Sequence, residues 1–302
     1  MLDLILRAGC FVAIIIFGFV LRKVGFFHAD DFHLISKIVM RITLPAAIIL
    51  SFSQKEIDAT MLSLALVGLA SGVIQMVAAF LLNLQGSRVK TSFEMLNHAG
   101  LNIGNFTLPF VQSFIGTTAV IVTSLFDIGN AVICLGGAYG VAATVKDGSG
   151  FSLRRIGKAL FSSVAFDIYI LMVVLNLARV TIPAPVVSLA ELIANANVFL
   201  AMLMIGVGFD PVLDRQHVFY IIKFLTTRYL LSALLAIFCF YLLPFGLEIR
   251  QTLVLLMFSP LTSTVPAFVS ELREDVGLAS TLNSISIFCS ILIIITLLTI
   301  ML

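Results

Sequence analysis

Two short stretches of the sequence place proline or glycine among Asn, Ser and Thr inside otherwise apolar runs. The residues are Gly104, Asn105, Thr107 and Pro109 in the first stretch, and Pro260, Thr262, Ser263, Thr264 and Pro266 in the second. Proline removes a helical hydrogen bond and glycine loosens the backbone, so both stretches predict broken helices. The half-helix that follows a break begins with free N–H groups and about half a positive charge, which suits an anion. We therefore predict reversible binding of a small anion at these stretches, without covalent chemistry.

An acid lies in another apolar run. Asp127 is followed three residues later by Asn130, on the same helix face. A carboxyl group at membrane depth is costly and indicates a function by default. It could hold a proton or a cation, or it could hydrogen-bond the loosened backbone of a broken helix. We expect the network role first, keep the ion role open, and add Asn283 of the last apolar run to the same group.

The composition indicates which elements must position these residues. Of 302 residues, 60% are hydrophobic and only 11% are charged, whereas soluble domains have about 25% charged residues. A net charge of +2 in short clusters excludes a basic nucleic-acid module. Four cysteines, all in apolar runs, form no metal motif and are too few for a disulfide scaffold, so we expect no metal and no cofactor. A multi-pass helical membrane protein remains.

Ten apolar segments are long enough to be considered as membrane spans, for which about 20 residues are needed. They cover residues 4–22, 33–53, 61–84, 93–113, 117–143, 157–178, 187–209, 218–243, 250–270 and 276–300. We expect all of them to be helical, because lipid leaves no partner for unpaired backbone groups. The predicted fold class is thus an all-α polytopic membrane protein.

Lys and Arg are distributed unequally over the two sides that ten spans define. Fourteen of the 18 fall in or beside the connections after spans 1, 3, 5, 7 and 9, and the other side carries only Arg7, Lys55, Arg179 and Arg250. The positive-inside rule therefore predicts cytoplasmic odd-numbered connections and two extracytoplasmic termini.

The two halves of the chain match by position. A basic, glycine-containing linker, residues 144–156, separates residues 1–143 from residues 157–302, with five spans in each part. Thr107-Leu-Pro109 in span 4 corresponds to Thr264-Val-Pro266 in span 9. Because five is odd, the second half enters the membrane from the opposite side, which predicts the inverted repeat of secondary transporters, with two broken helices crossing near the midplane.

The sequence around the first break resembles a signature of the auxin efflux carrier family. Asn102-Ile-Gly104-Asn-Phe106-Thr-Leu108-Pro109 is similar to Asn-x-Gly-Phe-x-Gly-Leu-Pro, with departures at Asn105 and Thr107. Further matches are Leu44-Pro45-Ala46, Phe126-Asp127-Ile-Gly-Asn130, Met204-Ile-Gly206 and the stretch from Val265 to Arg273. That family contains bacterial dicarboxylate and malonate carriers and the plant PIN-type auxin exporters.

The resemblance implies a mechanism as well as a fold. Spans 1, 2, 6 and 7 would form a scaffold, and spans 3–5 and 8–10 would form a transport unit that carries a small organic anion, a mono- or dicarboxylate, by an elevator motion. The family's binding positions carry over to Asn102, Gly104, Pro109, Thr264 and Pro266, to which we add the neighbouring Asn105 and Ser263. Localisation would be the bacterial inner membrane, and any homodimer would form through the scaffold spans in the lipid bilayer.

Several single polar residues were assigned from their place in the spans. We expect Asp167 to make a polar contact in the scaffold, Asn195 and Asn197 to cap a helix at the membrane interface, and Gln75 to hydrogen-bond between helices. His98 is expected to be structural, and Lys37 and Arg41 to be interfacial anchors. Arg228 is kept as a candidate partner for a carboxylate.

Three other functions compete with this interpretation. A sodium-coupled organic-anion symporter of the bile-acid symporter type would need a sodium site, for which Asp127 and Asn130 are the candidates. An intramembrane protease could use Asp127 with Asp167, or the Gly206-Val-Gly208-Phe-Asp210 stretch, although its spacing differs by one residue from Gly-x-Gly-Asp. A channel or a structural role is the third.

Overall fold

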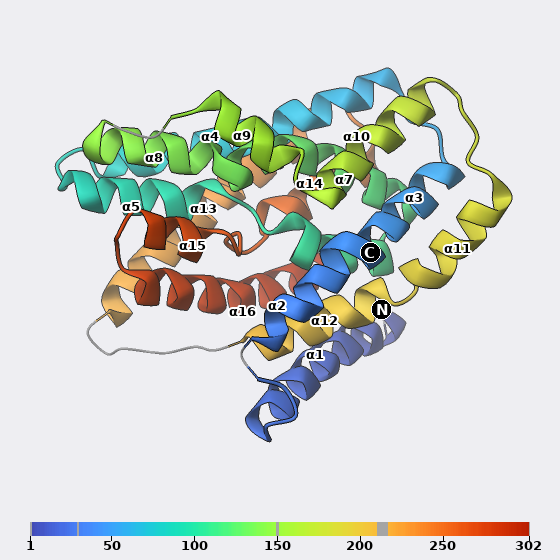
Figure 1. Cartoon of the computed structure of the whole chain (residues 1–302), viewed down its shortest axis with the longest axis horizontal. Coiled ribbons are helices and arrows are strands. Elements are labelled where there is room, and N and C mark those ends of the chain that lie inside the picture. Colours follow the sequence, from blue (N-terminus) through green and yellow to red (C-terminus); the bar gives the residue numbers. More distant parts are fainter. Residues whose placement is uncertain (1, 29, 149–150, 210–216, 302) are drawn as a thin grey trace.

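The computed structural model is a bundle of α-helices, and it describes residues 2–28, 30–148, 151–209 and 217–301 (Figure 1). The all-helical expectation is confirmed, because the described residues form no strand beyond one isolated β-bridge. In chain order the elements are α1 (Leu2–Lys23), α2 (Asp31–Ile38), η1 (Val39–Thr43), α3 (Leu44–Gln54), η2 (Ala59–Leu62), α4 (Ser63–Leu82), α5 (Arg88–Ala99), η3 (Ile103–Thr107), α6 (Leu108–Phe114), α7 (Thr117–Val132), η4 (Ile133–Gly137), α8 (Ala138–Asp147), α9 (Leu153–Leu160), α10 (Val164–Leu177), α11 (Ala184–Ala194), α12 (Asn197–Gly208), α13 (Val218–Leu242), α14 (Leu247–Met257), α15 (Val265–Glu271) and α16 (Val276–Met301).

Each of the ten predicted segments coincides with one helix or with consecutive helices. By length and composition, six helices in the described residues can cross a membrane: Asp31–Gln54, Ala59–Leu82, Thr117–Asp147, Ala184–Gly208, Val218–Leu242 and Val276–Met301. A seventh is added if α9 and α10 form one bent span. The chain is therefore a multi-pass membrane protein, and ten crossings stay a prediction.

The sixth segment differs from the expectation. Helix α9 and helix α10 meet at an angle of 80°, so residues 157–178 are not one straight span. Ser152 and Ser163 each accept a backbone N–H at the start of one of these helices, and these two N-caps divide the segment. The sequence of α9 is amphipathic, and its buried Ile156 faces the kink at Gly136 of η4. Helix α9 thus begins inside the expected linker, residues 144–156. The connection between the two halves therefore includes this helix and is longer than expected.

The helices pack into two groups (Figure 1). In the first helix group, α1 and α2 pack on α12, and α3 packs on α10 and α11. In the second helix group, α4 packs on α5 and α7, α5 on α8, α14 on α7 and α13, and α15 on α16. The boundary between the groups is formed where α3 and α10 contact α7 and where α12 contacts α6.

Glycines allow the closest helix contacts inside each group. A Cβ atom on Gly129 of α7 would lie 1.8 Å from the backbone oxygen of Ala65 in α4. A Cβ atom on Gly206 of α12 would lie 2.1 Å from the backbone oxygen of Ile15 in α1. Small residues at such contacts let two membrane helices approach closely and gain dispersion energy, which substitutes for the hydrophobic effect in lipid. Each group therefore has one tight helix pair at its centre.

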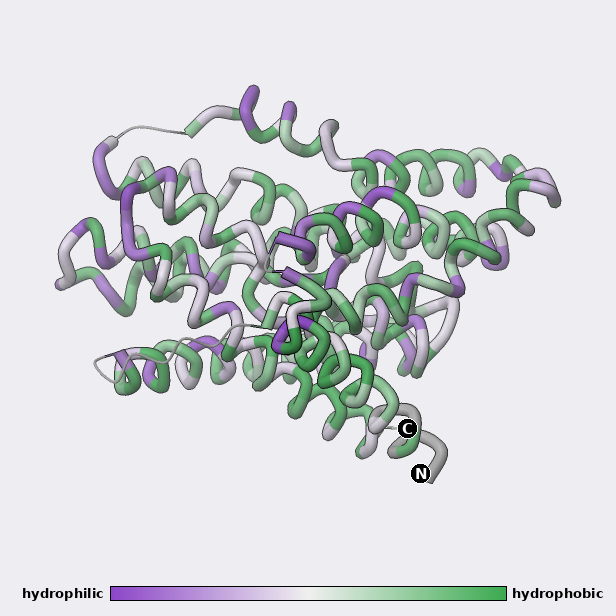
Figure 2. The backbone as a smooth tube through the Cα atoms, turned by 60° about the horizontal axis from the view of Figure 1, so that its bottom comes forward, coloured by the Kyte–Doolittle hydropathy of each residue, from purple (hydrophilic) through white to green (hydrophobic). Residues whose placement is uncertain are grey.

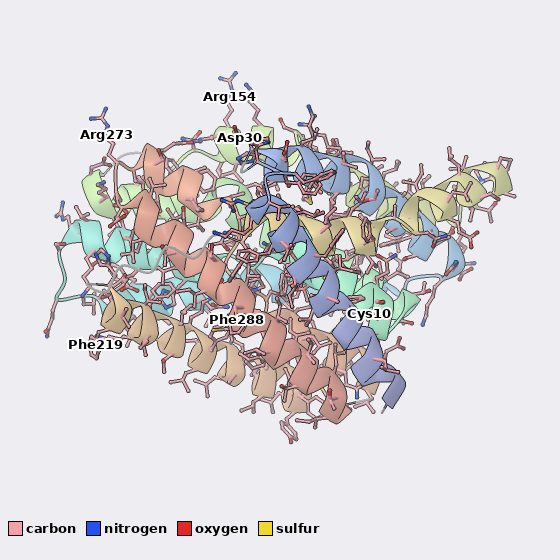
Figure 3. The ribbon with its side chains drawn as sticks, turned by 90° about the horizontal axis from the view of Figure 1, so that it is seen from below. Cys10, Asp30, Arg154, Phe219, Arg273 and Phe288 are labelled. Carbon is pink, nitrogen blue, oxygen red and sulfur yellow. The ribbon has the colours of Figure 1, made fainter. Side chains whose placement is uncertain are left out.

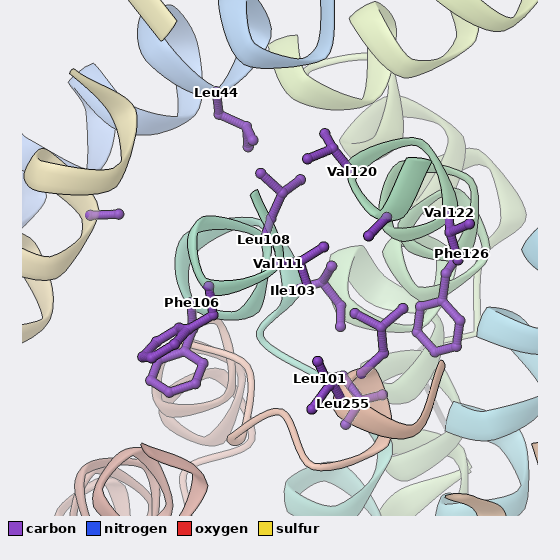
Figure 4. Packing of buried hydrophobic residues seen from close by; sticks show 14 of the residues in the cluster. Leu44, Leu101, Ile103, Phe106, Leu108, Val111, Val120, Val122, Phe126 and Leu255 are labelled. Atoms are coloured by element: carbon purple, nitrogen blue, oxygen red, sulfur yellow. The ribbon is translucent and has the colours of Figure 1, made fainter. Parts of the chain in front are cut away.

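The buried core continues across the boundary between the groups. In Figure 4, Leu44 of α3 points toward Leu108 of α6, and Leu101 and Ile103 lie near Leu255 of α14. All five side chains are at most 1% exposed. The boundary is therefore largely apolar, and the polar contacts described below are exceptions to it.

The outer surface is apolar along the helices. Figure 2 shows mostly hydrophobic helices, with hydrophilic residues concentrated in connections and helix ends. Phe219 and Phe288 are 80% and 53% exposed. In Figure 3, Phe219 lies at one edge of the molecule, and Arg154 and Arg273 extend from another edge. Exposed large apolar side chains of this kind suit lipid contact.

Candidate functional site

Both stretches that predict broken helices are interrupted in the structure, and the two interruptions cross. Helix α5 ends at Ala99, and α14 ends at Met257. Leu101 and Leu261 form an antiparallel β-bridge, and the Asn102 backbone N–H donates to the Pro260 carbonyl oxygen at 3.0 Å. We call this region the crossing, residues 100–105 and 258–264.

The two prolines differ in where they stand. Pro266 lies in the first turn of α15, where a proline costs no hydrogen bond, whereas Pro109 lies where the π-helix η3 passes into α6. Gly100 is needed for the close approach of the two breaks, since a Cβ atom there would lie 2.5 Å from the Thr262 methyl carbon. The breaks thus depend on proline to restart a helix and on glycine to bring the chains together.

Asn130 of α7 holds the first break. Its Oδ1 accepts the Leu101 backbone N–H at 3.2 Å, and its Nδ2 donates to the Leu101 carbonyl oxygen at 2.9 Å. The same Nδ2 donates to Asp127 Oδ1 at 2.8 Å. Tyr169 of α10 donates its hydroxyl to Asp127 Oδ2 at 3.1 Å. A polar chain therefore runs from the first helix group through Asp127 and Asn130 to the crossing.

Hydroxyl groups hold the second break. Ser286 of α16 accepts the Leu261 backbone N–H at 3.1 Å, in the same way that Asn130 serves Leu101. The hydroxyls of Thr107 and Ser259 hydrogen-bond at 2.5 Å and tie the two breaks together. Thr264 donates to the Cys134 carbonyl oxygen at 3.0 Å. Both backbone groups of Leu101 and the N–H of Leu261 are thus met by side chains of α7 and α16, in the last predicted span of each half.

Arg228 of α13 caps the C-terminal end of α5. It is completely buried, and its guanidinium donates to the carbonyl oxygens of Asn97, His98 and Gly100 at 3.3, 2.6 and 2.9 Å. It also donates to Gln75 Oε1 of α4 at 3.3 Å. The sequence keeps Arg228 as a candidate partner for a carboxylate, whereas its acceptors among the described residues are neutral. Arg228 is also not one of the charges in a connection between spans, although the positive-inside count includes it among those after span 7.

Two cavities meet at the crossing. A vestibule of about 750 Å³ lies between α2 and α12 on one side and α15 and α16 on the other. A pocket of about 90 Å³ lies between the crossing and α10, and Asp127 and Tyr169 are in its wall. Asn102, Asn105 and Ser263 line both cavities. A solute that enters the vestibule therefore reaches the polar side chains of both breaks.

The remaining predicted site residues are distributed over these two cavities with one exception. Pro266 and Asn283 line the vestibule, and Gly104, Thr264 and Asn130 line the small pocket. Pro109 is buried and lines neither, so its place at the start of α6 is structural. Asn105 Oδ1 and Asn283 Oδ1 are buried, and neither has a hydrogen-bond partner in the part of the chain that the structure describes. A half-turn about the last side-chain bond exchanges the oxygen and the NH2 group of an Asn amide. The amides of Asn105 and Asn283 can therefore offer a donor or an acceptor to the cavity.

Two expectations for polar residues of the first helix group are wrong. Asp167 is exposed in the first turn of α10, and its side chain makes no polar contact with the other described residues, so the expected scaffold contact is not formed. Asn197 is completely buried rather than interfacial; it accepts from Thr43 at 2.9 Å and donates to Gln112 Oε1 of α6 at 3.1 Å. Asp210, which the protease interpretation used, lies outside the described residues.

Sequence reasoning missed Tyr169, Ser286 and Glu94. Glu94 is buried on α5, where it accepts from Tyr220 at 2.8 Å and lies near His98. An acid inside a predicted span is a signal that the sequence contained. Tyr169 and Ser286 carried no such signal, because single hydroxyls are common in apolar helices.

The comparison with known families decides the class. Residues 10–147 match the family model described as membrane transport protein. The chain carries a domain of the auxin efflux carrier family. The match runs from α1 to α8 and includes the first break, Asp127 and Asn130. No curated protein matches the chain. The match over these residues therefore indicates a membrane transporter.

Proposed function

We propose that this transporter is a secondary carrier of a small organic anion, a mono- or dicarboxylate, which binds at the crossing. The observation that carries the proposal is the shared lining of the two cavities by Asn102, Asn105 and Ser263. Amide and hydroxyl groups from both breaks converge there, and two buried amide oxygens lack partners. Such groups recognise a carboxylate by hydrogen bonds and release it without chemistry.

The division into two helix groups supports an elevator mechanism. We assign the first helix group to the scaffold and the second to the transport unit. The vestibule runs along their boundary, and the boundary is mostly apolar, as a sliding surface requires. The equivalent bonds of Leu101 to Asn130 and of Leu261 to Ser286 support an inverted repeat of five and five spans.

The direction in which the vestibule opens can be related to the charge count. His33, His217 and Asp275 line its outer part, in or beside the connections after spans 1, 7 and 9. The excess of Lys and Arg assigns these connections to the cytoplasm. We therefore assign the structure to an inward-facing state in the bacterial inner membrane, with both termini outside.

Coupling to sodium is the second candidate. The small pocket brings Asp127 close to the hydroxyl side chains of Ser163, Thr262 and Thr264, which are oxygen ligands of the kind that a hard cation takes. Uptake by vesicles that contain the purified protein should then depend on external sodium. Equal uptake with sodium or potassium outside would remove this candidate and leave a proton or no coupling ion.

The proposed function is tested by uptake of radiolabelled mono- and dicarboxylates into vesicles with the wild type, Asn102→Ala and Pro266→Ala. The Asn102 side chain makes no hydrogen bond in the described residues, so its removal should abolish binding while the fold persists. Uptake at the wild-type rate by both variants would contradict the crossing as the site, and no carboxylate uptake by the wild type would contradict the substrate class.

The elevator motion is tested by cross-linking the boundary. Thr117 of α7 donates to Gln54 of α3 at 3.0 Å in an exposed position. A disulfide between Gln54→Cys and Thr117→Cys, in a background without native cysteines, should stop uptake until a reductant is added. The matched control joins Tyr139→Cys and Phe268→Cys, whose native rings are 5.3 Å apart inside the second helix group. Full uptake by the cross-linked boundary pair would exclude the motion.

A further inference from the structure

The charge of Arg228 is unusual for its surroundings. Its side chain is 0% exposed, and its four acceptors are one amide and three backbone carbonyl oxygens. No ion pair of Arg228 occurs among the described residues, and its Nε has no partner. A buried cation without a counter-ion is costly, and a neutral amide could supply part of the same capping. The positive charge itself therefore requires an explanation.

Helix ends alone do not make the crossing positive. Two C-terminal ends, of α5 and α14, meet two N-terminal starts, of the η3–α6 helix and α15, and each end carries about half a charge. These partial charges cancel to a first approximation. The formal charges then decide the sign, and Asp127 beside the crossing is negative when ionised. Without Arg228, the crossing would repel an anion.

Arg228 acts on one end of this arrangement. Its guanidinium caps α5 at Asn97, His98 and Gly100, two residues before Asn102. The end of α14 is closed by backbone bonds instead, from Phe258 to Leu255 and from Ser259 to Leu256, and receives no charge. Of the two helix ends, the end of α5 at the first break is therefore the one that has a positive charge, that of Arg228, next to it.

We propose that Arg228 is the residue that makes the crossing select anions: a fixed buried charge that acts through the end of α5 without touching the substrate. It is a positioning residue with a second, electrostatic role. The proposal rests on the proposed function only for the identity of the transported solute. The electrostatic role can be measured without any substrate.

Gln75 offers a way to cancel the charge while the cap remains. Gln75 Oε1 accepts from Arg228 at 3.3 Å, and Gln75 Nε2 has no hydrogen-bond partner. Gln75→Glu keeps the acceptor, loses no bond, and places a carboxylate against the guanidinium. Arg228→Gln removes the charge but keeps two N–H donors, and Arg228→Lys keeps the charge but loses the fork of donors.

The test uses a reporter cysteine at the crossing. In a background with the four native cysteines replaced, Ser263→Cys is modified by an anionic sulfonatoethyl methanethiosulfonate or by its cationic trimethylammonioethyl counterpart. The ratio of the two rates measures the local potential, because any change in the thiol itself affects both reagents alike. A second reporter, Ser280→Cys, lies in the same vestibule but is exposed.

We expect the anionic-to-cationic ratio at Ser263→Cys to fall about tenfold in Gln75→Glu and in Arg228→Gln, as for loss of one charge in a poorly screened site. Arg228→Lys should keep the wild-type ratio, and the ratio at Ser280→Cys should change far less in every variant. A wild-type ratio in Gln75→Glu would overturn the proposal even if Arg228→Gln fails to fold. Failure of carboxylate uptake with the expected ratios would overturn the proposed substrate class instead.

Discussion

The two breaks at the crossing have the same backbone design but are stabilised by different chemistry. At the first break, Arg228 caps the end of α5 and Asn130 pairs with both backbone groups of Leu101. At the second break, α14 closes on itself and Ser286 supplies one hydroxyl to Leu261. The first break therefore carries charge and amide groups, and the second is neutral.

This difference indicates that the two breaks can have different roles although they occupy equivalent positions in the two halves. An extended backbone segment inside a membrane requires partners wherever it occurs. Among the described residues, the first break is the one connected through Asp127 to Tyr169 of the other helix group. We expect substitutions at the first break to have the larger effects.

The largest effect is expected from Arg228→Ala. It removes donors from three backbone carbonyls at the end of α5, and orphaned buried groups cost about 1–3 kcal/mol each, so a loss of about 3 kcal/mol of stability is expected. The measurement is thermal unfolding in detergent. Arg250→Ala is the matched control, since that arginine donates to a single carbonyl, of Phe240. Equal losses for the two variants would contradict a special role of the first break.

Asn130→Ala should follow in size. It breaks two bonds to Leu101 and one to Asp127, which predicts a loss of about 2 kcal/mol together with loss of uptake. Ser124→Ala serves as the control on the same helix, because its hydroxyl bonds only to the Val120 carbonyl one turn earlier. Normal uptake by Asn130→Ala at normal stability would show that the first break holds its shape without this amide.

Ser286→Ala tests the second break. The hydroxyl's bond to the Leu261 N–H is lost, together with its own donation to the Asn283 carbonyl oxygen inside α16, so the expected cost is about 1 kcal/mol, less than for Asn130→Ala. The comparison uses the same unfolding measurement for both variants. A larger loss for Ser286→Ala than for Asn130→Ala would reverse the order that the structure predicts.

Asn283→Ala should have the smallest effect on the fold. Its Oδ1 has no partner, so stability should change by less than about 0.5 kcal/mol. Carboxylate binding, measured by ligand-induced thermal shift, should weaken because the amide lines the vestibule. Unchanged binding would remove Asn283 from the site and leave Asn102 and Asn105 as its amides.

Sequence reasoning reached the helical class and the resemblance to a transporter family because both depend on local patterns. Apolar runs of span length and the stretch around Asn102 can be read without three-dimensional information. It failed where a residue's neighbours come from distant parts of the chain. Asn197 looked interfacial because it lies near a segment end, yet Thr43 and Gln112 enclose it from two other helices. Arg228 looked like a charge near a connection, yet it reaches the end of α5.

One contact outside the membrane segments shows the same limit. Arg155 of α9 donates to Glu271 at the end of α15, and this hydrogen bond raises the pKa of the guanidinium above its ordinary value. The sequence places these residues more than a hundred positions apart. Because α9 and α10 meet at 80°, α9 lies against the second helix group, where Arg155 reaches Glu271.

By itself, the sequence determined that this protein is a helical membrane protein, that two of its helices break, and that residues 10–147 match a membrane-transport family model. These properties follow from hydrophobicity, proline and glycine, whose effects act within a few residues. Only the tertiary structure decided that Leu101 meets Leu261, that Asn130 and Ser286 satisfy them, and that a buried guanidinium closes one break. Hydrogen bonds and charges act over a few ångströms of space, and folding brings together groups that the chain keeps far apart.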